Sequence, residues 1–257
     1  MSFKKSLLAT ALVAASASAN AGVIIFDGNF GGTAKAGTVE SGVGTGSNGG
    51  GDTWGDTLVF NDFDVTTGAS ISNIAASNFN TTTGVTFNPA TKGVYQDISP
   101  SHGGLGAFTV GGAEDTDNLD SNVGAGVNVD EILFFDFRSD VILDTAWFNG
   151  GHTEYPAYID GNGQAGDTKF NIFTSSNGVD YDSVFPGNTQ QATNPNDWLS
   201  TGVTSGYRYW AIAATGYEPA PGGYVEAISY TAVSEPATLA LLGLGLAGLG
   251  FVRRKQA

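Results

Sequence analysis

Cysteine is absent from the 257 residues of this chain. Disulfides, thiolate metal sites and cysteine nucleophiles are therefore excluded. A domain of this size can be held together by its hydrophobic core alone, so the absence does not argue against export. The chain is instead rich in glycine, with 38 residues, and only 14% of its residues are charged. This composition is typical of an extracellular β-rich protein.

Basic residues are scarce, since Lys and Arg number 10 against 25 Asp and Glu. All the acidic residues lie between Asp27 and Glu235 with only five basic ones, so this span has a net charge of −20. Nucleic acid is bound through basic surfaces, and we therefore expect no nucleic-acid partner. The charge could attract cations, but self-repulsion that keeps the protein soluble is the simpler interpretation.

Histidine is nearly absent, with only His102 and His152. The chain has neither the G-x-S-x-G sequence of a serine hydrolase nor the H-E-x-x-H sequence of a zinc protease. A glycoside hydrolase needs two carboxylates at a suitable separation, but so many acidic residues guarantee chance pairs. The acidic residues to inspect are those expected on strands: Glu131, Asp136, Asp144 and Glu226. We expect no enzymatic activity and no catalytic residues.

Sustained helical periodicity is also missing between residues 22 and 235. Short apolar and aromatic runs separated by Gly and Asn turns predict strands instead. They are expected at 23–26, 57–60, 85–87, 94–98, 105–110, 131–137, 141–148, 168–174, 179–185, 207–214 and 224–230. The Asn177-Gly178 step between two of these runs predicts a hairpin, because both residues tolerate positive φ. The sequence predicts an all-β fold, an antiparallel β-sandwich or jelly roll over 22–232, with 27–56 as a Gly-rich flexible segment.

Residues 1–21 have the three parts of a secretory signal peptide. Lys4 and Lys5 form the charged part, an apolar stretch follows, and Ala19 and Ala21 form a small-x-small cleavage site. The apolar stretch is too short to span a bilayer. We expect signal peptidase to remove this segment and the rest of the chain to be exported.

A second apolar run, 237–252, contains no charge and is followed by the basic tail 253–257. As a helix this run would cover about 24 Å of a hydrocarbon core about 30 Å thick, and Arg253 and Arg254 can extend its reach by snorkelling. A basic flank favours the cytoplasmic side of the membrane. The sequence therefore predicts a single transmembrane helix, with the ectodomain outside the inner membrane.

The C-terminal segment 233–257 resembles the PEP-CTERM sorting signal. The resemblance rests on Glu235-Pro236, the glycine-rich apolar run and the Arg-Arg-Lys group that ends at Lys255, while Ser234 stands where the family has its first proline. It implies a Gram-negative bacterium in which the membrane enzyme exosortase cleaves near Glu235-Pro236. It also implies temporary anchoring with the ectodomain in the periplasm, then delivery to the cell surface or to the extracellular matrix of a biofilm.

Residues 170–185 and 207–212 resemble the late strands of a galactose-binding-like, discoidin-type jelly roll. The similarity lies in an aromatic hairpin with a Ser-Ser-Asn-Gly turn and in a strand that carries Arg-Tyr. This resemblance implies the fold but transfers no ligand.

Two acidic loops have the alternating oxygens that calcium prefers. Their candidate ligands are Asp115, Asp117 and Asp120 in the first loop and Asp160, Asn162 and Asp167 in the second. Solvated loops without a metal are the alternative, and no other cofactor is expected. Trp198 follows a polar loop and is the candidate for stacking on a sugar, whereas Trp147 and Trp210 lie within strands and are expected in the core.

These features favour a non-catalytic adhesive or structural β module at the cell surface. The alternatives are a carbohydrate-binding module for exopolysaccharide and, less favoured, a secreted glycoside hydrolase.

Overall fold

A computed structural model gives the fold of the protein. It describes residues 21–27, 37–41, 53–72, 85–86, 92–98, 103–109, 119–124, 127–149, 169–185, 191–192, 198–214 and 220–233. The first eight strands are β1 (Ala21–Ile25), β2 (Thr38–Ser41), β3 (Thr53–Gly55), β4 (Thr57–Phe60), β5 (Val65–Ser72), β6 (Val85–Thr86), β7 (Lys92–Asp97) and β8 (Gly104–Thr109). The others are β9 (Leu119–Gly124), β10 (Val127–Asn149), β11 (Lys169–Ser175), β12 (Asp180–Ser183), β13 (Gln191–Ala192), β14 (Trp198–Ser200), β15 (Tyr207–Ala214) and β16 (Ala220–Ala232).

The prediction of an all-β, antiparallel fold is confirmed. Every pairing between strands is antiparallel. Apart from the 3₁₀ turn Asn61–Phe63, no helix occurs in the ranges given above. Two short strands, β2 and β3, lie within 27–56, where the sequence predicted a flexible segment without strands. The glycine run 42–51 lies outside the described residues.

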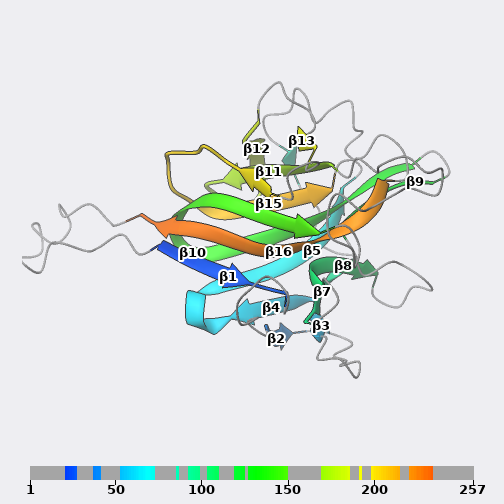
Figure 1. Ribbon diagram of the computed structural model, residues 1–257, viewed down its shortest axis with the longest axis horizontal. Helices are drawn as coiled ribbons and strands as arrows, with labels where there is room; N and C mark the ends of the chain where they lie inside the picture. Colours follow the sequence, from blue (N-terminus) through cyan, green and yellow to red (C-terminus); the bar gives the residue numbers. More distant parts are fainter. Residues whose placement is uncertain are drawn as a thin grey trace, which may run out of the picture.

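β10 is the organising strand of the molecule, and the sequence did not predict its continuity. The runs 131–137 and 141–148 were expected as two strands, but both belong to one 23-residue strand. The strand bends at Arg138, whose φ of 56° is unusual for a side chain of this size. Its first half pairs with β5 and β15, and its second half pairs with β14 and β16. The two halves run in opposite directions on either side of the bend (Figure 1).

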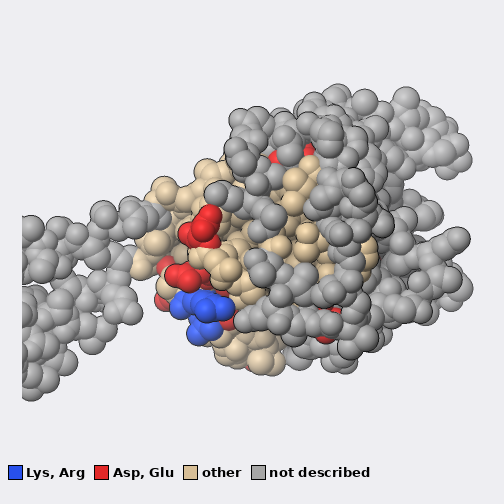
Figure 2. Space-filling view, turned by 90° about the horizontal axis from the view of Figure 1, so that it is seen from below, with Lys and Arg blue, Asp and Glu red and all other residues tan. Residues whose placement is uncertain are grey.

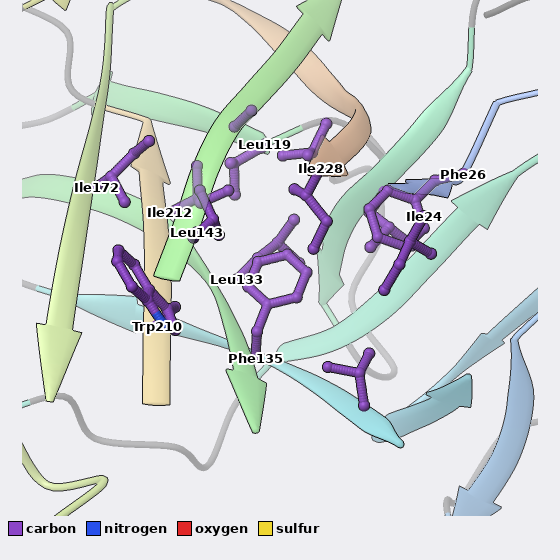
Figure 3. Packing of buried hydrophobic residues seen from close by; sticks show 14 of the residues in the cluster. Ile24, Phe26, Leu119, Leu133, Phe135, Leu143, Ile172, Trp210, Ile212 and Ile228 are labelled. Atoms are coloured by element: carbon purple, nitrogen blue, oxygen red, sulfur yellow. The ribbon is translucent and has the colours of Figure 1, made fainter. Parts of the chain in front are cut away.

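The hydrophobic core contains side chains from both halves of β10. Leu133 and Phe135 come from the first half, and Leu143 comes from the second (Figure 3). Phe148 of the second half belongs to the same core. They pack together with apolar residues of β1, β4, β5, β7, β8, β11, β14, β15 and β16. The rings of Phe148 and Phe170 are stacked with centroids 4.2 Å apart. The bend in β10 therefore places both halves of one strand against a single core.

A second, smaller apolar cluster covers the other face of β10, β11 and β15. Its buried members are Ile132, Phe173, Tyr181, Ala211 and Ala213. Tyr181 comes from β12, and its ring lies 5.6 Å from that of Phe134. Burial raises the pKa of the Tyr181 hydroxyl above its ordinary value. Because these strands are buried on both faces here, β15 and the first half of β10 carry apolar residues at consecutive positions. β11 differs, since Asn171 and Thr174 are among its buried residues.

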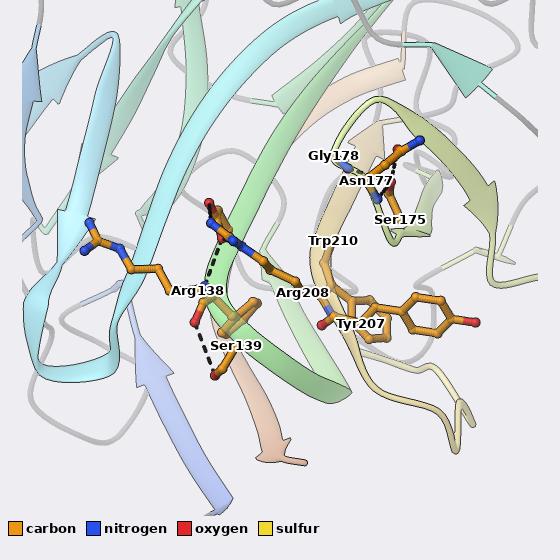
Figure 4. Close-up of polar contacts among 10 residues, drawn as sticks. Arg138, Ser139, Ser175, Asn177, Gly178, Tyr207, Arg208 and Trp210 are labelled. Atoms are coloured by element: carbon orange, nitrogen blue, oxygen red, sulfur yellow. Dashed lines mark hydrogen bonds and ion pairs between the residues drawn. The ribbon is translucent and has the colours of Figure 1, made fainter. Parts of the chain in front are cut away.

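The predicted hairpin between β11 and β12 is present. Gly178 has a φ of 72°, and the Ser175 hydroxyl accepts hydrogen bonds from the backbone N–H groups of Asn177 and Gly178 (Figure 4). The Asn177 side-chain oxygen accepts two more, from Val179 and Asp180, both at 2.9 Å. The turn is therefore held by its own Ser and Asn side chains, and of the Asn-Gly step only Gly178 has a positive φ.

The two ends of the described domain lie side by side. β1 pairs with β16 so that Ala21 is opposite Thr231 and Ile25 is opposite Ala227. Gln96 fixes the far end of β1, because its side-chain amide donates to the Phe26 carbonyl at 3.1 Å. The start of β1 and the end of β16 consequently lie at the same end of the molecule (Figure 1). None of the described residues forms a helix long and apolar enough to cross a membrane, and the predicted helix 237–252 lies outside them.

Candidate functional site

The side of the β1–β16–β10–β14 layer that points away from the core is the main candidate surface, and we call it the outer face. Cross-strand register defines its rows, because residues directly opposite each other point to the same side. One row consists of Ile25, Ala227, Trp147 and Trp198, and the next consists of Val23, Ser229, Thr145 and Ser200. The residues between these rows point into the core: Ile24, Ile228, Ala146 and Leu199.

Two tryptophans stand next to each other on the outer face. Trp147 of β10 is directly opposite Trp198 of β14. Trp198 is 43% exposed and Trp147 is partly exposed. Trp210 is buried as predicted, and its ring N–H donates to the Tyr207 carbonyl at 3.0 Å. Trp147 was also expected in the core, but its neighbours Ala146 and Phe148 take the inward positions.

Hydroxyl groups line the second row of the outer face, beside a β-bulge at Asp144. Leu143 pairs with Tyr230 and Thr145 pairs with Ser229, which leaves Asp144 as the extra residue. Thr231 donates its hydroxyl hydrogen to the Asp144 carboxylate at 2.9 Å. Ser200 donates to the Asp144 carbonyl at 3.3 Å. The bulge thus brings polar groups next to the tryptophan pair.

A charged cluster occupies the bend of β10, away from the tryptophan pair. The Asp136 carboxylate accepts two hydrogen bonds from the Arg208 guanidinium, at 2.7 and 2.8 Å, and one from the Arg138 N–H at 2.8 Å (Figure 4). Burial tends to raise the pKa of Asp136, but these hydrogen bonds outweigh it and hold the pKa below its ordinary value. Figure 2 shows basic side chains gathered in one place and bordered by acidic ones. The hydrogen bonds of this cluster hold the bend. A carboxylate fully engaged with arginine is also a poor general acid.

The other acids singled out from the sequence lie on β10 and β16. Asp144 accepts the hydrogen bond from Thr231, and Glu131 and Glu226 are buried in their strands. In the part of the chain that the structure describes, no group of three or more His, Cys, Asp or Glu side chains could hold a metal ion.

The predicted calcium ligands fall almost entirely outside the described residues. Asp115, Asp117, Asp160, Asn162 and Asp167 lie there, as do His102 and His152. Asp120 belongs to the backbone of β9. The two acidic loops therefore stay a prediction from the sequence.

Of the predicted processing residues, only Ala21 is described. It begins β1, opposite Thr231. Val233 follows β16, and its N–H donates to the Asp140 carbonyl at 2.9 Å. Ala19, Ser234, Glu235, Pro236, Arg253 and Arg254 lie outside the described residues. The folded domain consequently reaches to within one residue of Ser234.

Comparison with known protein families identifies a PEP-CTERM protein-sorting motif at residues 232–255. This motif is typical of exported proteins that are anchored in the membrane and then processed by exosortase. Neither a curated protein nor a solved structure matches the chain. The resemblance to a galactose-binding-like jelly roll thus has no support from a related structure.

Proposed function

We propose that this chain is a non-catalytic adhesive module that exosortase sorts to the surface or extracellular matrix of a Gram-negative bacterium, and that its adhesive partner is carbohydrate. The sorting motif at 232–255 supports the sorting by exosortase. The exposed Trp198 beside Trp147 supports the second part. An aromatic ring with a polar edge is suited to a ligand that is apolar on one face and wet on the other.

In the proposed route, signal peptidase removes residues 1–21 and the helix 237–252 holds the ectodomain at the inner membrane. Exosortase then cleaves near Glu235-Pro236 and releases the domain towards the surface. The domain itself is proposed to be a β-sandwich, since the two halves of β10 pair with different strands and enclose one core. A glycoside hydrolase is disfavoured, because Asp136 and Asp144 are engaged in structural hydrogen bonds.

The sorting step can be tested in a host that contains exosortase. We expect the wild-type chain to lose its C-terminal segment, and the double variant E235A/P236A to remain full length in the inner membrane. S234P, which restores the family's first proline, is the matched control and is expected to be processed at least as completely as wild type. Full processing of E235A/P236A would contradict the proposal.

Carbohydrate adhesion can be tested with the exported, processed protein on a glycan array and in an activity screen on the same glycans. Binding without turnover is the expected result. Turnover of any glycan would instead favour the hydrolase, and the absence of binding to all of them would leave only a structural role.

A further inference from the structure

We propose that the outer face binds an uncharged polysaccharide chain, which lies across the strands with Trp147 and Trp198 as its stacking surface. This inference rests on the proposed carbohydrate adhesion and adds the place of the site, the direction of the ligand and its class.

The register of four strands gives the site its shape. Adjacent strands are about 4.8 Å apart, so the row from Ile25 to Trp198 extends about 14 Å across the sheet. The row is apolar throughout: Ala227 is buried, while Ile25 and Trp147 on either side of it are partly exposed. Val23 begins the parallel row with 47% of its surface exposed. A row that crosses the strands matches an extended ligand better than a compact one, because its apolar groups lie along a line.

The tryptophan pair supplies the contact surface. Residues directly opposite on neighbouring strands have Cβ atoms about 5 Å apart, so the two indole side chains leave the sheet next to each other. Exposing an indole to water is unfavourable, and large exposed aromatic side chains on a folded domain often mark binding sites. The faces of sugar rings carry C–H groups that can stack on such a surface while their hydroxyls stay at the rim.

The hydroxyl row supplies the polar contacts. Ser229, Thr145 and Ser200 lie one row from the indoles, and a hydroxyl both donates and accepts hydrogen bonds. The Ser200 hydroxyl already donates to the Asp144 carbonyl, so it contributes acceptor capacity. Sugar hydroxyls have the same dual character, so each can find a partner without a fixed charge. An apolar row beside a hydroxyl row therefore matches the alternation of C–H faces and hydroxyl edges along a polysaccharide.

Charge decides which class of polysaccharide fits. Among its described residues, the outer face carries the Asp144 carboxylate and no basic group. The span from Asp27 to Glu235 has a net charge of −20, because 25 acidic residues stand against five basic ones. An anionic polysaccharide would be repelled by this field, most strongly at low salt. An anionic ligand is therefore disfavoured. The aromatic and hydroxyl groups of the face match an uncharged ligand, whose binding is expected to be insensitive to ionic strength.

The test uses the exported, processed protein and four variants. The probes are a neutral β-glucan, a neutral α-glucan and a polyuronate, with affinity measured by calorimetry at low and high salt. We expect a neutral glucan to bind, and W198A and W147A each to weaken its binding about tenfold or more. W198F, which keeps an aromatic ring, is expected to retain most of the affinity. V179A is the matched control, since Val179 is 53% exposed in the β11–β12 turn, and it is expected to bind like wild type.

The other outcomes show which part of the proposal is wrong. If a glucan binds but W198A, W147A and V179A bind equally well, carbohydrate adhesion stands and the site assigned here is wrong. If only the polyuronate binds, with strong salt dependence, the ligand class is wrong. If no probe binds and W198A abolishes a dimer seen by light scattering, the face joins two copies of this chain. Thermal unfolding of each variant shows whether a loss of binding is a loss of fold.

Discussion

Gly104 is the residue at which β8 passes closest to β16. Its φ is 137°, and a Cβ atom there would lie 2.5 Å from the Val225 carbonyl oxygen. Gly202 also has a positive φ, of 62°, but a Cβ atom there would meet nothing within 4 Å. The two positions therefore separate backbone strain from steric overlap.

We expect G104A to lower the free energy of unfolding by about 2–4 kcal/mol, because alanine is strained at the φ of residue 104 and its Cβ atom overlaps the backbone of β16. G202A is expected to cost about 1 kcal/mol, because only strain acts there. Urea denaturation of both variants provides the measurement. Equal losses would show that the overlap at Gly104 is relieved by a small backbone shift.

Asp136 connects stability to pH at the bend of β10. Hydrogen bonds from Arg208 and Arg138 hold its pKa below the ordinary value of 3.8. A carboxyl group with a lowered folded-state pKa stabilises the fold above its unfolded pKa, and this contribution is lost as the pH falls through the folded pKa. The pair is partly exposed, so its contribution is at most about 1 kcal/mol.

We accordingly expect D136N to be less stable than wild type near neutral pH, and the difference to shrink below about pH 4. Urea denaturation across this pH range provides the measurement. D182N is the control, since Asp182 lies on an exposed position of β12, and its difference from wild type is expected to be small throughout. A D136N difference that stays constant with pH would rule out the ion pair as its cause.

At the scale of elements, the bend in β10 shows what the sequence could predict. The runs 131–137 and 141–148 were found because their apolar and aromatic residues have strong strand propensity. Their union was missed because Arg138-Ser139-Asp140 has the composition of a turn. The pairing of each half with a different set of strands depends on contacts distant in sequence. For the same reason, the outward position of Trp147 was not evident, since the Asp144 bulge changes the alternation.

The bend depends on an unusual backbone angle at residue 138, which substitutions can test. Arg138 has a φ of 56°, which is unfavourable for a long side chain. We expect R138G to raise the free energy of unfolding by about 0.5–1 kcal/mol and R138V to lower it by about 1–2 kcal/mol, as measured by denaturant unfolding. D64G is the control, because Asp64 has nearly the same φ of 52° but tolerates it better, and its change is expected near zero. If R138G were as unstable as R138V, the guanidinium and not the backbone angle would hold the bend.

At the scale of the whole molecule, the first and last described residues, Ala21 and Val233, lie at the same end of the sheet. Ala21 is opposite Thr231, and the Val233 N–H is bonded to the Asp140 carbonyl. The predicted signal-peptidase bond, between Ala21 and Gly22, is therefore inside the β1–β16 pairing. A Cβ atom on Gly22 would lie 2.8 Å from the Tyr230 ring, so this residue is closely covered. The sequence predicted both processing segments from composition. The pairing of Ala21 with Thr231 follows only from the fold.

Proteins commonly recognise extended peptides by adding them as a strand, which a segment already paired in a sheet cannot provide. We therefore expect signal peptidase to cleave the folded precursor slowly, because β1 must first leave β16. I24D, which places a charge at a buried position of β1, is expected to be cleaved at least several times faster. V23D is the matched control, because Val23 is 47% exposed on the same strand, and its rate is expected to equal that of wild type. The measurement is a time course of cleavage by purified signal peptidase in detergent. Equal rates for all three precursors would mean that the Ala21-Gly22 bond is accessible while β1 is paired, and that signal-peptide removal does not have to precede the closing of the fold.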